Sequence, residues 1–435
     1  MTPALRLQAA LDLIGEVDRV ARPADAVVSA WLRGRRKMED ADRGFVLALL
    51  DALLRHRARI GWWLESQGRD ETPRNRVLAW LVMGEGRTTE QVKRMFTGAK
   101  FAPAPLSGDE AALVAKLQGR TMVHPAMPDE VRLECPDWAA GALRDRFGAA
   151  FEAEMAALLT PPTLDLRVNT LKATREEMLR ELTALGLPAE PARMAPQGIR
   201  IGERVSLARV APLKSGAVEI QDEGSQLVAL LVGAGPGDRV VDFCAGAGGK
   251  TLAIAAQMAN KGRIVACDVN EGRLKRSTER FRKAGVHNAE TRLLASETDR
   301  WVKRHKGGFD RVLVDAPCSG TGTWRRNPDA RWRPEEEAGL DSLIALQGRI
   351  LASAARLVKP GGRLVYATCS LLTAENEAQV AAFLDTHPEF AVVPLAEVAP
   401  GLPSAHPDFL SLTPARHDTD GFFAAVLQRA TPAGA

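Results

Sequence analysis

Two of the five cysteines stand where a side chain can do covalent chemistry. Cys318 lies in the stretch VDAPCSGTG and Cys369 in YATCSLLTAENE, each after an apolar, β-branched run and directly before a serine. Ligands of open α/β sheets bind at the carboxyl ends of strands, so both thiols are placed for catalysis. The other cysteines are Cys135, Cys244 and Cys267. The odd total of five cysteines and the lack of a CxxC pair argue against a disulfide framework or a zinc site, and we expect no bound metal.

A glycine-rich segment, DFCAGAGGKT, offers a second chemical feature. Glycines let backbone N–H groups approach a ligand closely at the start of a helix. A phosphate-binding P-loop would need glycine where Cys244 stands, and a dinucleotide loop would need a third glycine where Thr251 stands. Asp268 ends the next apolar run, 22 residues after Gly246, where a carboxylate can accept both hydroxyls of a ribose. The pattern therefore predicts a cofactor of the nucleoside type.

A thiol in such a pocket suits one reaction on a pyrimidine. Carbon 5 of cytosine is a poor nucleophile, but a thiolate that adds to carbon 6 makes carbon 5 able to attack an activated methyl group. An acid must then hydrogen-bond N3 or the exocyclic amine, and Asp315, three residues before Cys318, is the candidate. The carbon 5 proton must leave afterwards and the attacking thiol must be expelled, and a second cysteine could assist these steps. This reasoning leaves open which of the two thiols attacks.

The elements that must position these groups follow one another as strand, loop and helix. Apolar, β-branched runs occur at residues 239–244, 263–268, 310–315 and 363–369, and a helical stretch follows each. This alternation predicts a parallel sheet with helices on both faces. If the strand order is the usual doubly wound one, the strands before Cys318 and Cys369 are neighbours and their loops share a pocket.

The first half of the chain has a different pattern. Residues 1–124 are predicted to be helical, because apolar residues recur at helical spacing from Leu7 to Val17 and again around Leu50. Residues 125–215 contain the strand-like LDLRVNT and the helical ATREEMLRELTALG, which is typical of a small α/β module. Residues 216–435 form the larger α/β region. We therefore expect three domains with these boundaries.

These motifs together resemble the Fmu/Sun (RsmB-like) family of RNA cytosine-C5 methyltransferases. The matching segments are FCAGAGGKT, ACDVN, VDAPCSGTG, LVKPGGRLVYATCS with Glu375 and Asn376 after it, and DGFF near the C-terminus. RVNTLK and VEIQDEGSQ resemble upstream elements, so the likeness spans about residues 160–430. It implies a class I, Rossmann-like methyltransferase domain, a small α/β RNA-binding subdomain and S-adenosylmethionine as cofactor. The helical region more weakly resembles the NusB-like RNA-binding domain of the ribosomal RNA members.

The resemblance also implies roles for single residues. Cys369 would be the nucleophile and Cys318 would assist product release, with Lys250 and Asp315 near both methyl donor and base. Asp268 would bind the ribose, and Arg273 would also contact the cofactor. The loop that wraps the cofactor would be Cys244, Ala245, Gly246, Ala247, Gly248, Gly249 and Lys250.

Two positions depart from the pattern of the family. Gly246 and Ala247 replace an Ala-Pro pair that the family often has, which loosens the turn without removing its shape. An acid that usually contacts the adenine would fall by spacing at Ser296, with Glu297 as a possible substitute.

Arginines and tryptophans after Cys318 suggest an RNA contact. The segment TGTWRRNPDARWR contains Trp324, Arg325 and Arg326, whose side chains could stack on unpaired bases or meet phosphates. Arg167 and Asn169 in RVNTLK are further predicted RNA contacts. The target cytosine must leave its stack to reach a thiol, so single-stranded or flipped RNA is implied. The alternative is a surface loop with core tryptophans.

Composition permits such a partner without demanding one. The 435 residues carry a net charge of +4, with no apolar run long enough for a membrane span and no secretory signal at the start. We expect a cytoplasmic, monomeric protein with no membrane partner. The predicted substrate is 16S ribosomal RNA. Transfer RNA, or a catalytically idle RNA-binding factor on this fold, are the alternatives.

Overall fold

A computed structural model describes residues 1–20, 22–202 and 210–431. The chain forms two compact units: residues 1–159 with 327–337, and residues 160–326 with 338–435. This division differs from the three predicted domains. Helices up to residue 159 belong to the first unit. The small sheet includes a strand beyond residue 215 and belongs to the second unit.

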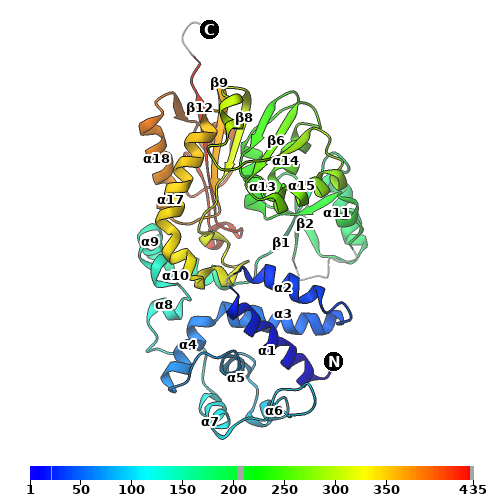
Figure 1. The fold of residues 1–435 in the computed structure, drawn as a ribbon, viewed down its shortest axis with the longest axis vertical. Helices are drawn as coiled ribbons and strands as arrows, with labels where there is room; N and C mark the ends of the chain where they lie inside the picture. The colour runs from blue at the N-terminus through cyan, green and yellow to red at the C-terminus, as the bar shows by residue number, and fades with distance from the viewer. Residues whose placement is uncertain (21, 203–209, 432–435) are drawn as a thin grey trace. The chain divides into compact units, whose positions relative to one another are not determined.

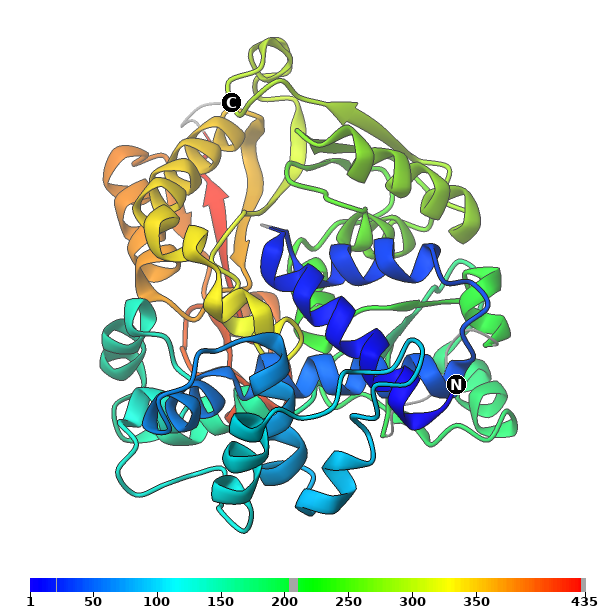
Figure 2. The same cartoon turned by 60° about the horizontal axis from the view of Figure 1, so that its bottom comes forward.

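The first unit is helical, as predicted, in the part of the chain that the structure describes (Figure 2). Two of its long helices begin at capped residues that are each followed by a proline. The Thr2 hydroxyl accepts the Leu5 N–H, and the Thr72 hydroxyl accepts the Asn75 N–H. The helices are α1 (Pro3–Arg19), α2 (Ala24–Arg33), α3 (Asp40–Arg55), α4 (Arg57–Ser66), α5 (Pro73–Met83), α6 (Thr89–Lys93), α7 (Gly108–Leu117), α8 (Asp129–Arg132), α9 (Asp137–Phe147), η1 (Gly148–Ala150) and α10 (Phe151–Leu159).

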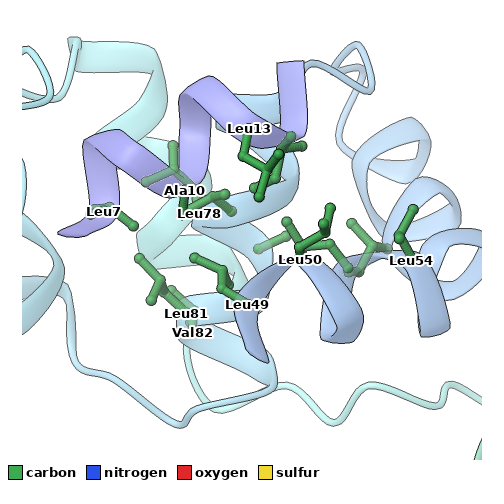
Figure 3. Packing of buried hydrophobic residues seen from close by; sticks show 14 of the residues in the cluster. Leu7, Ala10, Leu13, Leu49, Leu50, Leu54, Leu78, Leu81 and Val82 are labelled. Carbon is green, nitrogen blue, oxygen red and sulfur yellow. The ribbon is translucent and has the colours of Figure 1, made fainter. Parts of the chain in front are cut away.

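Leucines hold the helices of the first unit together. Leu7 and Leu13 of α1 meet Leu50 of α3 and Leu78 of α5 in a core that excludes water (Figure 3). Leu7, Ala10 and Leu13 recur every three residues, so they lie on one face of α1. Burial of a leucine side chain stabilises the fold by about 1.5–3 kcal/mol, so this face determines how the helices pack.

Residues 327–337 complete the first unit from a distant part of the sequence. They include η4 (Pro328–Trp332), in which the Arg331 side chain is 1% exposed. Its guanidinium donates to the carbonyl oxygens of Glu134 (3.0 Å) and Leu158 (2.6 Å). The Trp332 ring N–H donates to the carbonyl of Leu54 at 3.3 Å. These contacts anchor the segment.

The second unit contains a small antiparallel sheet in the order β2-β3-β1-β4. The predicted strand in LDLRVNT is β1 (Leu164–Val168), and it pairs with β3 (Gly198–Ile201) and β4 (Val218–Ile220). The predicted helix is α11 (Arg175–Ala184), closed at Gly186 with φ +77°. The remaining elements are β2 (Ala189–Pro191) and α12 (Ala211–Ser215).

The larger sheet of the second unit positions the site. Its order is β10-β12-β9-β8-β5-β6-β7, with β11 beside β12. Five strands run parallel, namely β5 (Arg239–Asp242), β6 (Arg263–Asp268), β7 (Ala289–Leu293), β8 (Phe309–Asp315) and β9 (Val358–Thr368). The others are β10 (Phe390–Val392), β11 (Leu410–Leu412) and β12 (Phe422–Arg429). β8 and β9 are neighbours, as predicted.

Helices cover both faces of this sheet (Figure 1). One face packs on α13 (Glu223–Leu231), α14 (Gly249–Gln257) and α15 (Glu271–Ala284). The other packs on α16 (Arg300–Arg304), α17 (Pro334–Ala355) and α18 (Glu377–Thr386). The prediction of an α/β fold is thus confirmed.

The four predicted strands run parallel, and strands that follow residue 369 make the sheet mixed. β12 runs antiparallel to β9, and β10 and β11 run antiparallel to β12. The apolar runs before residue 369 carry no information on the direction of strands that follow. A connection through α18 and α19 (Leu395–Val398) returns the chain so that β12 forms in reverse. No helix in the described residues is both long and apolar enough to cross a membrane.

Candidate active site

One cavity of about 820 Å³ lies within the second unit, at the carboxyl ends of the parallel strands. Residues at the ends of four strands line it, among them Asp242, Asp268, Asp315 and Cys369. Because parallel strands end at the same sheet edge, side chains far apart in the sequence meet here. The cavity therefore contains both chemical features that the sequence suggested.

The glycine-rich loop forms one wall of this cavity. It links β5 to the first turn of α14, and the Ala245 N–H donates to the Cys267 carbonyl at 2.8 Å. Gly248 has φ +79°, and a Cβ there would lie 2.7 Å from the ring of Phe281. Gly246 has φ +55°, lines the cavity, and would place a Cβ within 4 Å of no atom. Glycine is thus required at position 248, where a side chain would be strained and would contact Phe281. At position 246 the missing side chain leaves free space in the cavity.

Asp268 is held at the end of β6 beside this loop. One carboxylate oxygen accepts the Gly246 N–H at 2.8 Å, and the other accepts the Asn270 N–H at 2.7 Å. A carboxylate has about four lone-pair sites, so each oxygen can still accept a hydroxyl. Asp268 therefore shapes the loop and leaves acceptor capacity toward the cavity.

The other lining residues suit the remainder of a nucleoside. Val269, directly after Asp268, is 64% exposed, and Leu294 also lines the cavity. Such apolar side chains can cover the faces of a purine ring. The loop backbone, the Asp268 acceptors and this apolar wall together fit S-adenosylmethionine.

The other predicted cofactor contacts also border this cavity. Arg273, in the first turn of α15, lines it, and so do Ser296 and Glu297. The Glu297 carboxylate accepts the Arg349 guanidinium at 2.8 Å, whereas the Ser296 hydroxyl lies 3.1 Å from that of Thr298. The carboxylate of Glu297 is thus paired with Arg349. Its contact with the adenine, in place of the acid that the family usually has, stays a prediction.

Cys318 and Cys369 are brought together as expected. Their sulfur atoms lie 3.4 Å apart, and both residues line the cavity. Contact with the Cys369 thiol, together with burial, raises the pKa of Cys318 well above its ordinary value. Cys318 is therefore a protonated thiol near neutral pH.

Asp315 and Lys250 form an ion pair in the same cavity. The ammonium nitrogen lies 2.6 Å from a carboxylate oxygen. Burial alone would lower the pKa of Lys250, but the Asp315 carboxylate outweighs it and the pKa is raised. Lys250 is therefore cationic and holds Asp315 at the end of β8.

A third acid in the cavity wall was missed by the sequence analysis. Asp242 is 1% exposed, and burial raises its pKa to about 7. The Thr251 hydroxyl donates to one of its oxygens at 2.6 Å. The only sequence signal was its position at the end of the first strand, before the glycine loop.

A group of charged residues lines the wall beyond the thiols. The Arg326 guanidinium donates to Asp420 at 2.7 Å and to Asp222 at 3.3 Å. Burial, with the Asp420 carboxylate, raises the pKa of Asp222 to about 7. Asp222 and Asp420 belong to the motifs VEIQDEGSQ and DGFF, which were noted for resemblance and not for chemistry.

The structure corrects four of the five predicted RNA contacts. Trp324 and Arg325 are 0% and 2% exposed, and Arg325 forms an ion pair with Asp420 at 2.7 Å. Arg167 donates to Gln221 at 2.6 Å, and the Asn169 amide donates to two backbone carbonyls. All four side chains are buried in this structure, and the bonds of Arg325, Arg167 and Asn169 hold elements of the second unit together. Arg326 alone of the five lines the cavity.

A mixed sheet with helices on both faces and a glycine-rich loop after its first parallel strand is the Rossmann-like architecture of class I methyltransferases. Comparisons with known proteins narrow this class. The family model described as 16S rRNA methyltransferase RsmB/F matches residues 229–428. A second, described as the ferredoxin-like domain of RsmF/B-like methyltransferases, matches residues 135–208.

Relatives extend the match over most of the chain. Ribosomal RNA small subunit methyltransferase B of Serratia proteamaculans is 30% identical over 410 residues, covering 90% of this chain and 92% of the relative. The probable enzyme of that name from Synechocystis sp. is 36% identical over 299 residues, covering 68% of this chain and 67% of the relative. A solved methyltransferase homologue from Pyrococcus horikoshii is 28% identical, with a TM-score of 0.60, and covers 71% of this chain and all of its own.

The chain belongs to the RsmB/F family of 16S rRNA methyltransferases, which confirms the predicted Fmu/Sun relationship. Its cofactor is S-adenosylmethionine, as the resemblance implied.

Proposed function

We propose that this protein methylates carbon 5 of a cytosine in 16S ribosomal RNA, with Cys369 as covalent nucleophile. One observation carries the proposal: two thiols 3.4 Å apart share a cavity with an acid, a lysine and the cofactor loop. Methylation of a ring nitrogen, a ribose hydroxyl or an exocyclic amine needs no thiol, whereas carbon 5 must first be activated by addition at carbon 6.

The residues divide the work according to their positions. The Cys369 sulfur forms a bond to carbon 6 of the cytosine, and the ring electrons move toward N3. Asp315, held by Lys250, accepts a hydrogen bond from the exocyclic amine as a carboxylate and donates one to N3 when protonated, as negative charge develops there. S-adenosylmethionine, when bound, supplies the methyl group that carbon 5 attacks. Loss of the carbon 5 proton to water then restores the double bond between carbons 5 and 6, and the Cys369 sulfur leaves with the electron pair of its bond to carbon 6.

The environment of Cys318 supports this order of events. Its raised pKa keeps the S–H group intact beside the sulfur of Cys369. A neighbouring S–H can protonate the departing Cys369 sulfur when the adduct collapses, so Cys318 assists release.

For RNA binding we propose a cavity contact and a separate surface. Arg326 can meet the flipped nucleotide, because two acids anchor its guanidinium at the cavity wall and its third nitrogen has no hydrogen-bond partner among the described residues. The small sheet and the helical first unit are proposed to bind the surrounding RNA. The names of the relatives support ribosomal RNA over transfer RNA.

The substrate is tested by bisulfite sequencing of RNA from a strain that lacks this gene. We expect one 5-methylcytosine to disappear from 16S ribosomal RNA and to return when the gene is restored. Loss from a transfer RNA instead would overturn the choice of substrate. A catalytically idle RNA-binding factor would show no lost mark and no thermal stabilisation by saturating S-adenosylmethionine.

A further inference from the structure

A buried carboxylate lies directly behind the two cysteines. Glu375 is 0% exposed and does not line the cavity. No lysine, arginine or histidine among the described residues forms an ion pair with it. Burial of a carboxylate without a cationic partner is unfavourable unless hydrogen bonds compensate it. The buried Glu375 carboxylate must therefore be stabilised by the hydrogen-bond donors that it contacts.

Those groups are the residues that follow each cysteine. The Ser319 N–H donates to one Glu375 oxygen at 2.8 Å, and the Ser319 hydroxyl donates to the other at 2.5 Å. The Ser370 hydroxyl also donates to the second oxygen. One carboxylate thus bonds to both cysteine-bearing loops, each at the residue directly after the cysteine.

Further contacts make this arrangement rigid. Gln347 of α17 donates from one amide nitrogen to Glu375 and to the Pro317 carbonyl, at 2.9 Å each. The two serine hydroxyls lie 3.3 Å apart. Two more bonds join the loops beside this group: the Gly322 N–H donates to the Cys369 carbonyl at 2.9 Å, and the Leu371 N–H donates to the Thr321 hydroxyl at 2.7 Å. The side chain of Glu375 therefore fixes the two loops against each other where the thiols emerge.

We propose that Glu375 is a positioning residue that sets the separation of the Cys318 and Cys369 thiols. It touches neither cavity nor reacting atoms and acts through Ser319 and Ser370. Its effect on methylation rests on the proposed function, whereas its effect on the thiol separation does not.

The thiol separation can be measured without RNA or cofactor. Diamide takes one hydrogen from each of two thiols, is reduced to the hydrazine, and leaves a disulfide bond between the sulfur atoms. The rate at which Cys318 and Cys369 become linked, followed by mass spectrometry of peptides, reports how well the loops hold them together. We expect Glu375→Gln to slow this rate by about tenfold or more, because an error of about 1 Å in placement has large kinetic effects. An unchanged or faster rate would overturn the proposal.

A matched variant separates positioning from general loss of stability. Glu223 is also 0% exposed in the second unit, and its carboxylate accepts two backbone N–H groups away from the cysteines. Glu223→Gln should lower the melting temperature and leave the rate of disulfide formation within twofold of wild type. An equal slowing in both variants would contradict a specific role for Glu375.

Serine variants extend the test if Glu375→Gln does not fold. Ser319→Ala and Ser370→Ala each remove one hydroxyl from Glu375 and should slow linkage in the same direction by a smaller factor. Ser404→Ala removes a hydroxyl that organises the loop before β11 and should not affect linkage. Linkage at the wild-type rate in both Ser319→Ala and Ser370→Ala would overturn the proposal.

Methylation assays add the second readout. Glu375→Gln should lower kcat by about tenfold or more with KM for RNA within twofold, because the cavity wall itself is intact. A raised KM with unchanged kcat would contradict positioning. If wild type methylates no RNA but the contrast in linkage persists, the proposed function has failed and the role of Glu375 stands.

Discussion

At the scale of single residues, the pair Lys250–Asp315 determines where charge can be stabilised in the cavity. The ammonium of Lys250 fixes the Asp315 carboxylate at the end of β8, so the carboxylate does not have to move when the target cytosine binds. The two side chains come from different elements, Lys250 from the first turn of α14 and Asp315 from the end of β8. We therefore treat them as one functional unit.

Replacement of Asp315 should affect catalysis without affecting the cofactor. We expect Asp315→Asn to lower the single-turnover methylation rate by about 10²–10⁴-fold, the usual contribution of a positioned acid or base. Thermal stabilisation by S-adenosylmethionine should persist. The control is Asp310→Asn, which removes an ion pair with Lys359 near the other end of the same strand. Wild-type turnover in Asp315→Asn would refute its assigned role.

Asp242 makes a prediction for the pH dependence of stability. Its pKa of about 7 in the folded protein lies above the ordinary 3.8, so the folded state binds more protons between these pH values. The stabilising contribution is complete below about pH 4 and is lost as pH rises through 7. One pKa unit corresponds to about 1.4 kcal/mol, so the change is on the order of a few kcal/mol.

The variant Asp242→Asn isolates this effect. It keeps an acceptor for Thr251 and does not ionise, so its melting temperature relative to wild type should rise between pH 5 and pH 8. Calorimetry at a series of pH values measures the difference. A difference that is constant or falls with pH would show that Asp242 is not protonated in the fold.

At the scale of elements, the start of α14 is the most constrained part of the cofactor site. We expect Gly248→Ala to destabilise the protein by about 1–3 kcal/mol, because a side chain at positive φ is strained and its Cβ would contact Phe281. Stabilisation by S-adenosylmethionine should also weaken. Gly235→Ala, at a position with open space, should change neither quantity beyond about 0.5 kcal/mol. Equal effects in the two variants would count against this account of the loop.

The strands and the cofactor loop could be predicted from the sequence because their signals are local. Apolar runs mark the buried strands β5, β6, β8 and β9, and glycine spacing marks the loop that follows the first. The direction of β12 could not be predicted, because it depends on how a long connection returns. Glu375 was visible only as a motif residue, since its partners lie 56 and 5 positions away.

The loop after Cys318 shows why residue type alone misleads. Trp324 and Arg325 have the chemistry of an RNA contact, yet they are buried. A sequence analysis expects an arginine to be exposed unless its acidic partner is known. The partner of Arg325 is Asp420, which lies 95 residues further along the chain. Only tertiary structure shows that pairing.

At the scale of the whole molecule, the chain passes from the second unit to the first and back within one segment. Residues 327–337 follow the Cys318 loop in sequence but pack with residues 1–159. The buried guanidinium of Arg331 bonds to two carbonyls of that unit. Stability of the helical unit thus depends on residues that follow the catalytic loop.

Replacement of Arg331 should weaken the first unit selectively. We expect Arg331→Leu to cost about 2–4 kcal/mol, because buried carbonyls lose their donor. Hydrogen exchange should rise in α4 and α10, while β5 and β6 remain protected. Arg333→Ala, which removes a partly exposed side chain paired with Asp329, should cost less than about 1 kcal/mol. Equal exchange in Arg331→Leu and wild type would contradict this dependence.

The assignment of the two thiols is tested most directly by denaturing gels of cysteine variants incubated with RNA and S-adenosylmethionine. Cys369→Ser should neither methylate nor form an adduct, whereas Cys318→Ser should accumulate a covalent enzyme–RNA adduct. Cys135→Ala, at a buried thiol of the first unit, should behave like wild type. An adduct formed by Cys369→Ser and not by Cys318→Ser would contradict the role of Cys369 as nucleophile.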